Sequence, residues 1–248
     1  MSTVLITGAT SGVGLSLAKD YLAQGDQVIA CGRNKAVLEQ LSAQGMITLA
    51  FDTSEQIAVE NAFKQLSETV THIDRLVLNA GVCEYIEDGH LDHQVMQRTM
   101  DINVVAPIRV LNAAMALLSR SSQPQVALVS SASIYLPFAR AEAYGASKAA
   151  IQYIGHVLRN TLKHKSIDVS TIVLGFIDTP LTQKNNFEMP MLKPAHEASR
   201  AIIKGLEQRK AEIKFPKLFC ATLSFISILP LTVRLALARA LMVSSSKD

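Results

Sequence analysis

The chain has 248 residues, of which 49% are hydrophobic and 18% charged, and its formal net charge is only +3. This composition suits one globular domain with a large core and excludes an intrinsically disordered chain. The charges are scattered, so the chain lacks the basic stripe expected of a nucleic-acid-binding protein. Cys31, Cys83 and Cys220 lie far apart, which argues against both a disulfide framework and a cysteine metal site. Met1 to Thr3 lead directly into an apolar run without a charged leader, and we expect a cytoplasmic protein.

Short apolar runs alternate with segments of helical periodicity along the chain. The runs rich in Val, Ile and Leu predict buried strands at Thr3–Ile6, Gln27–Cys31, Met46–Phe51, Ile73–Leu78, Gln125–Ser130 and Val169–Leu174, and a last strand is expected at Glu212–Phe215. The 3.6-residue pattern predicts helices at Gly12–Gln24, Lys35–Gln44, Glu55–Val70, Asp92–Ser119, Ala143–His164 and Ala195–Gln208. This alternation indicates an α/β fold: a single-domain doubly wound parallel sheet, or Rossmann fold, with helices on both faces.

A glycine-rich turn joins the first strand to the first helix. Its sequence is Thr7-Gly8-Ala9-Thr10-Ser11-Gly12-Val13-Gly14. Glycines at such a place allow a tight turn and let the backbone approach a pyrophosphate, while the helix N-terminus supplies free N–H groups. We therefore predict that Gly8, Thr10, Ser11, Gly12, Val13 and Gly14 bind a dinucleotide; the alternative is an ordinary turn with incidental glycines.

The spacing G-x-x-x-G-x-G, together with the chain length, resembles the short-chain dehydrogenase/reductase family. Asn79-Ala80-Gly81 closes the fourth strand as the family's N-A-G motif does, and Asp52-Thr53 closes the third strand where the family contacts the adenine. The resemblance covers residues 1 to about 180 and implies that all five residues contact the cofactor. It also implies a homodimer or homotetramer, because the helices around Asp92–Ser119 and Ala143–His164 form the subunit contact in many members.

The end of the second strand predicts which nicotinamide cofactor binds. The chain reads Ala30-Cys31-Gly32-Arg33-Asn34 there, so no carboxylate is present to hold the ribose 2′-hydroxyl of NAD. The planar guanidinium of Arg33 can pair with the 2′-phosphate of NADP, with Asn34 beside it. We expect NADP(H) to be preferred, with NAD(H) as the alternative. A solvated surface arginine is the other reading of Arg33, and the glycine turn lacks the basic residue that many NADP-binding relatives carry.

Tyr144 and Lys148 are the candidate catalytic pair. They are four residues apart in a predicted helix, so the phenol and the ammonium lie on one face. Ser131 ends the fifth strand and precedes Tyr144 by the spacing that the family uses for its serine. Carbonyl reduction by hydride leaves negative charge on the oxygen, so a proton donor is needed there. Tyr144 would give this proton, and Lys148 would lower the pKa of the phenol.

The resemblance assigns the remaining site residues. It implies that Lys148 also binds the nicotinamide ribose, as part of a cofactor contact shared with Tyr144, and that Ser131 orients the substrate oxygen. Asn103 matches the helix asparagine that holds a water in the family's proton relay. Leu174 to Pro180 resembles the P-G-x-x-x-T segment that binds the carboxamide, with leucine in place of the first proline, and Ile177 and Thr179 are the expected contacts.

The last part of the chain is apolar. Leu218 to Val233 carry no charge, but 16 residues with Pro230 inside are too few to span a bilayer. Leu223, Ile226, Leu229, Val233, Leu237 and Leu241 follow helical spacing and predict an amphipathic helix. It can be a flap over the core, an oligomer contact or a peripheral membrane attachment.

We therefore expect one domain over residues 1–248. Residues 1–180 form the cofactor-binding and catalytic core, 181–210 a substrate lid, and 211–248 the last strand and an apolar extension. The predicted activity is an NADP(H)-dependent hydride transfer to a carbonyl or from an alcohol, and Phe176, Phe187, Met189 and Met191 near the lid favour a lipophilic substrate. A non-catalytic NADP(H)-binding regulator is the alternative. Asp101, His164, Asp178 and His196 lack metal-ligand spacing, so no metal site is predicted.

Overall fold

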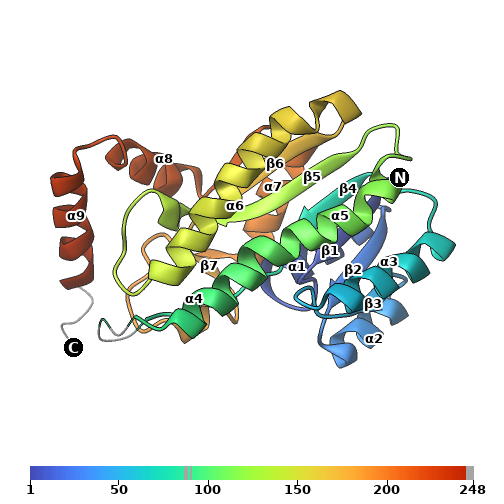
Figure 1. Cartoon of the computed structure of the whole chain (residues 1–248), viewed down its shortest axis with the longest axis horizontal. Helices are drawn as coiled ribbons and strands as arrows, with labels where there is room; N and C mark the ends of the chain where they lie inside the picture. The colour runs from blue at the N-terminus through green and yellow to red at the C-terminus, as the bar shows by residue number, and fades with distance from the viewer. Residues whose placement is uncertain (87–88, 90, 244–248) are drawn as a thin grey trace.

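Seven parallel strands form the centre of the computed structural model, which describes residues 1–86, 89 and 91–243 (Figure 1). Their order is β3-β2-β1-β4-β5-β6-β9. The strands are β1 (Thr3–Thr7), β2 (Gln27–Gly32), β3 (Ile47–Ala50), β4 (Arg75–Leu78), β5 (Gln125–Ser131), β6 (Asp168–Leu174) and β9 (Glu212–Phe215). A separate parallel pair joins β7 (Ile177–Asp178) to β8 (Lys193–Pro194). The chain places β2 and β3 on one side of β1 and then β4 on the other side. The strand order therefore reverses between β1 and β4, and a crevice is expected there at the carboxyl ends of the strands.

Helices cover both faces of the sheet (Figure 1). One face carries α1 (Gly12–Ala23), α2 (Lys35–Ala43) and α7 (Ala195–Glu207), which share one apolar core cluster. The other carries α3 (Gln56–Thr69), α5 (Ala106–Leu118) and α6 (Glu142–Thr161), which share a second cluster. Short 3₁₀ turns lie at Ala132–Ile134, Lys163–Lys165 and Thr182–Lys184. The predicted doubly wound α/β fold is confirmed, and the strands deviate from their predicted ends by at most two residues.

The helix predicted over Asp92–Ser119 has an unpredicted interruption. It consists of α4 (His93–Met100), a π-helical turn at Asp101–Val105, and α5. By length and composition alone, His93–Leu118 is long and apolar enough to cross a membrane. However, its apolar side, including Val110, Ala114 and Leu118, is fully buried against the sheet. Its hydropathy is therefore accounted for by packing in the core.

The C-terminal segment forms two helices, so the prediction of one continuous amphipathic helix was wrong. Helix α8 covers Lys217–Ile226 and helix α9 covers Leu231–Val243. The break occurs at Ser227–Pro230, because proline fixes its own φ and has no N–H with which to continue a helix. Both helices lie at one end of the molecule, outside the layers of the sheet (Figure 1). The Leu241 side chain and residues 244–248 of the expected apolar extension lie outside the described residues.

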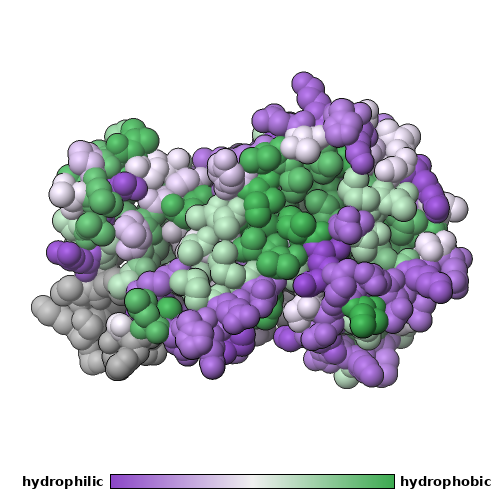
Figure 2. Space-filling view, in the orientation of Figure 1, coloured by the Kyte–Doolittle hydropathy of each residue, from purple (hydrophilic) through white to green (hydrophobic). Residues whose placement is uncertain are grey.

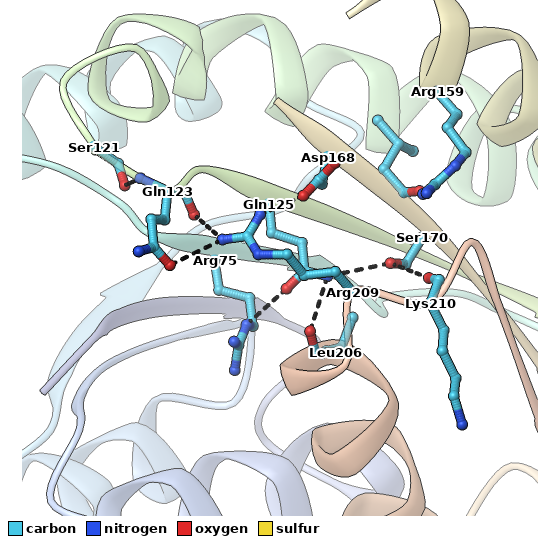
Figure 3. Close-up of polar contacts among 11 residues, drawn as sticks. Arg75, Ser121, Gln123, Gln125, Arg159, Asp168, Ser170, Leu206, Arg209 and Lys210 are labelled. Atoms are coloured by element: carbon cyan, nitrogen blue, oxygen red, sulfur yellow. Dashed lines mark hydrogen bonds and ion pairs between the residues drawn. The ribbon is translucent and has the colours of Figure 1, made fainter. Parts of the chain in front are cut away.

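A polar network ties α7 to the amino ends of the strands (Figure 3). Gln125 Nε2 donates to Ser170 Oγ and to the Leu206 carbonyl, each at 3.2 Å, and Arg75 Nε donates to Gln125 Oε1 at 3.0 Å. Arg209 pairs with Asp168 beside them. These groups lie at the amino ends of the strands. The candidate site lies at the other ends, the carboxyl ends.

Candidate active site

The glycine turn after β1 is closely packed. Gly12 adopts a φ of +53°, and a Cβ on it would lie 2.9 Å from Thr179 Cγ2. A Cβ on Gly14 would lie 2.3 Å from the carbonyl oxygen of Gly8, so only glycine fits. Ser11 precedes α1 without a side-chain cap, and the first turn of α1 holds no acidic residue. The helix N-terminus, at Gly12, Val13 and Gly14, thus has the N–H groups and dipole that suit an anion.

The second cofactor segment lies at the ends of β2 and β3. Arg33 Nη1 is 3.2 Å from Asp52 Oδ2, and the Arg33 side chain is largely exposed. Burial acts to raise the pKa of Asp52, but hydrogen bonds from Ser54 and from Arg33 outweigh it and lower the pKa. The Asn34 side chain accepts from the Val37 N–H, so it caps α2. Thr10 lies directly over Gly32: a Cβ on that glycine would be 2.6 Å from Thr10 Cγ2.

The Asn79-Ala80-Gly81 turn after β4 is fixed against the glycine turn. Asn79 Nδ2 donates to the Thr7 carbonyl at 3.0 Å, and the Asn79 and Ala80 N–H groups both donate to Thr7 Oγ1. A Cβ on Gly81 would lie 3.0 Å from Asn103 Oδ1 and 3.4 Å from Lys148 Nζ. The structure thus brings the predicted cofactor and catalytic segments together at this turn.

Thr53, Ile177 and Thr179 complete the predicted cofactor set. The carbonyl of Thr53 accepts from Arg109 Nη1 at 3.0 Å, beside Asp52. Ile177 is buried in β7, and Thr179 is held in a tight turn in which its N–H donates to Thr182 Oγ1. Thr179 contacts the glycine turn, as noted for Gly12, whereas Thr53 lies at the far side with Asp52.

Asn103 lies within the π-helical turn and is almost completely buried. Its Oδ1 accepts from the Val82 N–H at 2.8 Å, and its Nδ2 donates to the Val82 carbonyl and to Ser147 Oγ, each at 2.9 Å. Both N–H donors of the amide are therefore used. The side chain joins the loop after β4 to α6, which is a positioning role; the predicted water contact is not tested.

Ser131 and Tyr144 face each other at the carboxyl end of β5. Ser131 Oγ accepts from the Ser133 N–H at 3.2 Å, so it also caps a 3₁₀ turn. Burial raises the pKa of Tyr144 above its ordinary value, while the hydrogen bond from Ser131 lowers it in part. The expectation of a lowered phenol pKa was wrong for this structure, because desolvation outweighs the favourable neighbours. Tyr144 therefore keeps its proton at neutral pH.

Lys148 is 6% exposed. Its Nζ donates to the Val129 carbonyl at 3.0 Å and is 5.8 Å from the centroid of the Tyr144 ring. Burial lowers the pKa of Lys148 to about 8. The ammonium is thus the main charge in this part of the site at neutral pH. Its positive charge is lost as the pH rises through about 8.

A cavity of about 710 Å³ opens beside Tyr144 and Ser131. Its wall is largely aromatic: Phe176 packs against Phe187 at 6.1 Å and against Phe219 at 5.6 Å between ring centroids. Residues 181–190 supply part of the rim, whereas α7 is packed in the core. Of residues 181–210, which are predicted to form a lid, only those up to Pro190 line the cavity, and α8 supplies further wall through Phe219, Thr222, Leu223 and Ile226.

The cavity residues missed in the sequence include Tyr85, Arg140 and Phe219. Tyr85 donates its hydroxyl to Asn185 Oδ1 at 2.9 Å, and the Arg140 guanidinium lies 5.1 Å over the Tyr85 ring. Neither has a motif that could have marked it. Phe219 belongs to the long uncharged segment. That segment predicted an amphipathic helix but not a contribution to the cavity wall. Cys83 also lines the cavity, and burial raises the pKa of its thiol. Met191, by contrast, is exposed and outside the cavity wall.

The arrangement fits a dinucleotide and a small organic substrate. The uncapped N-terminus of α1, the turn at Gly81 and the exposed Arg33 follow the carboxyl ends of β1, β4 and β2, and the apolar cavity begins at Ser131, at the end of β5. The phenol and the serine hydroxyl line that cavity. Among the described residues, no group of three His, Cys, Asp or Glu side chains could hold a metal ion.

Comparisons with known proteins agree with this geometry. Residues 2–190 match the family model described as short chain dehydrogenase. An uncharacterized oxidoreductase of Myxococcus xanthus is 29% identical over 92% of both chains. A fatty acyl-CoA reductase of Acinetobacter baylyi is 29% identical over 84% of this chain and 74% of its own length. The short-chain dehydrogenase from Sphingobium yanoikuyae in complex with NADPH has the same fold, with a TM-score of 0.77, 22% identity, and coverage of 93% of this chain and 97% of that chain.

The family model covers well over half of the chain, including the glycine turn, Ser131, Tyr144 and Lys148. The chain therefore belongs to the short-chain dehydrogenase/reductase family of NAD(P)H-dependent oxidoreductases.

Proposed function

We propose that this oxidoreductase transfers a hydride between NADP(H) and the carbonyl or secondary alcohol of a lipophilic substrate. The observation that carries the proposal is the apolar cavity of about 710 Å³ that ends at the hydroxyls of Ser131 and Tyr144. A mostly apolar pocket with a few convergent polar groups is the usual form of a small-molecule site. The similarity to a fatty acyl-CoA reductase favours a substrate with a long hydrocarbon chain.

Tyr144 is proposed as the proton donor and Ser131 as the group that orients the substrate oxygen. When bound, NADPH supplies the hydride to the carbonyl carbon. The O–H bond of Tyr144 breaks as the carbonyl oxygen gains the proton, and the Ser131 hydroxyl stabilises the charge that develops on that oxygen. Because burial raises the pKa of Tyr144, the phenol is protonated and ready for the reductive direction. The Lys148 ammonium, 5.8 Å from the ring, then stabilises the phenolate until solvent returns a proton.

The proposed preference for NADP(H) rests on Arg33. Its guanidinium is exposed at the end of β2, held near Asp52 by an ion pair that solvent screens. A 2′-phosphate beside it would form charge-assisted hydrogen bonds, which are worth about 1.5–3 kcal/mol, or roughly tenfold or more in affinity. Fluorescence titration should show that Arg33→Ala weakens NADPH binding by about this factor and leaves NADH binding unchanged. Arg120→Ala, another exposed arginine, is the control; equal effects on both cofactors would remove the preference.

Oligomer formation is also proposed. Val105, Tyr153 and Val157 are exposed on the π-helical turn and α6, and Figure 2 shows an apolar band across this face where α5 and α6 lie in Figure 1. A homodimer or homotetramer would cover this face. Sedimentation velocity on the full chain and on Tyr153→Glu tests it, since a charge in such an interface should dissociate the subunits.

Turnover tests the proposed function. NADPH oxidation is followed by absorbance with long-chain ketones and aldehydes, sterols, quinones and acyl thioesters, for the wild type, Tyr144→Phe and Tyr153→Phe. We expect Tyr144→Phe to abolish turnover with nearly unchanged NADPH affinity, while Tyr153→Phe, on the exposed side of the same helix, keeps both. Lys148→Ala should reduce both. Tight NADPH binding without turnover on any substrate would instead favour a regulatory protein.

A further inference from the structure

The outer face of α8 carries an exposed apolar stripe. Leu218 and Phe225 are each 67% exposed, Ile228 in the following turn is 75% exposed, and Leu231 at the start of α9 is 56% exposed. The first two are seven residues apart, so they share one side of the helix, and Ala221 and Thr222 lie exposed between them. In Figure 2 the end of the molecule that α8 and α9 form in Figure 1 carries apolar surface interspersed with polar residues. We call Leu218, Phe225, Ile228 and Leu231 the outer stripe.

The inner face of the same helix is already occupied. Cys220 and Leu223 are buried in a cluster with Leu136 and Val173, and Phe219 and Ile226 line the cavity. The core and the cavity wall therefore account for the inner side chains, so they do not explain the outer stripe. Four large apolar side chains exposed together on one hairpin are unlike the single exposed apolar residues that are ordinary on protein surfaces.

The charged residues near the outer stripe are mostly basic. Residues 213–243 include four Lys or Arg and no Asp or Glu. Lys217 and Arg239 are exposed on α8 and α9, and Arg234 is half-buried one turn after Leu231. Lys214 is paired with Glu212, and Glu142 of α6 lines the groove between α6 and α9, at whose rim the exposed Leu231 and Arg239 also lie. The outer surface of the hairpin is therefore apolar with a basic border, which is the composition that binds an anionic lipid surface.

The length of α8 favours a position in the membrane–water interface over one that spans the membrane. Helix α8 has ten residues, about 15 Å of rise, against about 30 Å of hydrocarbon in a bilayer. Its inner face also holds the cavity wall, so it cannot leave the fold without opening the cavity. A hairpin that inserts only its outer side chains to the level of the acyl boundary meets both conditions.

We propose that the α8–α9 hairpin docks this protein peripherally on an anionic membrane, with the outer stripe inserted among the lipids and Lys217 and Arg239 at the headgroups. Because Phe219 and Ile226 on the other side of α8 line the cavity, docking brings the cavity wall next to the bilayer. The inference concerns binding to lipid and holds or fails independently of which carbonyl compound is reduced.

Vesicle co-sedimentation of the full-length protein tests the proposal. Vesicles of phosphatidylcholine alone are compared with vesicles that contain phosphatidylglycerol as well. We expect binding to the mixed vesicles. Phe225→Ser with Ile228→Ser should weaken it by about tenfold or more, because two large apolar side chains lose their burial. Lys217→Gln with Arg239→Gln should weaken it by about 25-fold, at about fivefold per charge, and only on anionic vesicles.

Matched variants separate these effects from general changes in the surface. Ile57→Ser removes an apolar side chain of α3 that is 72% exposed, against 75% for Ile228, and should leave sedimentation unchanged. Lys64→Gln with Lys163→Gln has the same net charge as the hairpin double variant and should bind as the wild type does. Failure of the wild type to sediment with anionic vesicles, or equal sedimentation of the hairpin variants, would overturn the proposal. So would a change in oligomeric mass on Phe225→Ser with no lipid binding, since the stripe would then join copies of the chain.

Discussion

Replacement of Lys148 by methionine separates the free-energy cost of its buried charge from its role in turnover. Burial lowers the pKa of Lys148 from 10.5 to about 8. At about 1.36 kcal/mol per pKa unit, the buried ammonium costs the folded protein about 3 kcal/mol at neutral pH. Methionine has a similar length and no charge, but it leaves the Val129 carbonyl without its 3.0 Å donor, which costs about 1–3 kcal/mol. The two effects nearly offset each other at neutral pH, so the net change there is small.

The pH dependence of this comparison is the sharper observable. The folded-state pKa is below the unfolded-state value, so between these two pKa values the unfolded chain binds more protons and the stability contributed by Lys148 rises with pH. From about pH 7 to about pH 9.5, the free energy of unfolding of the wild type should rise by about 2 kcal/mol relative to Lys148→Met. Other titrating groups are common to both proteins and cancel in the difference.

Denaturant unfolding of both proteins at the two pH values provides the measurement. Lys163→Met, at an exposed lysine, is the control and should show no such difference. NADPH turnover by Lys148→Met should be lost at both pH values, whereas turnover by the wild type should fall as the pH rises through about 8 and the ammonium loses its proton. A stability difference that does not change with pH would refute the argument that the buried ammonium titrates near 8.

Three further substitutions test parts of the site. Gly14→Ala should destabilise the fold by about 1–3 kcal/mol and weaken NADPH binding, because its Cβ would lie 2.3 Å from the Gly8 carbonyl, whereas Gly145→Ala, with open space around it, should not; equal melting temperatures would contradict this. Asn103→Leu should lose about 1–3 kcal/mol in denaturant unfolding, because the Val82 N–H and carbonyl lose their partners, and Asn103→Asp at least as much, because a buried carboxylate would place an acceptor against the Val82 carbonyl. Phe219→Ala should lower the KM for bulkier substrates in lipid-free assays, and Phe225→Ala, at an exposed position outside the cavity wall, should not; the same change in both variants would exclude Phe219 from the substrate wall.

The sheet could be predicted from sequence because its strands are short, apolar runs bounded by turns. The strands β1 to β6 were found because Val, Ile and Leu are concentrated in them, whereas the two-residue strands β7 and β8 are too short to leave such a pattern. The π-helical turn around Asn103 could not be found, since the apolar spacing of α4 and α5 runs through it almost unchanged. Pro230 does mark the break between α8 and α9, but the apolar spacing continues across it.

The site was predicted in its residues more than in its electrostatics. Motifs identified Ser131, Tyr144 and Lys148, and the structure brings them together. The direction of the Tyr144 pKa depends on how deeply the phenol is buried, and burial is set by distant residues that no local spacing reveals. The cavity wall could not be predicted for the same reason. Tyr85, Arg140 and Phe219 come from three separate segments and meet only in the folded chain.

A crystal structure of the protein with NADPH and an unreactive long-chain ketone analogue tests the central claim most directly. The account predicts that the analogue's oxygen accepts hydrogen bonds from Tyr144 and Ser131, at about 2.7 Å each, with its hydrocarbon chain along Phe176 and Phe219. An analogue bound elsewhere, or one whose oxygen is turned away from the phenol, would contradict it.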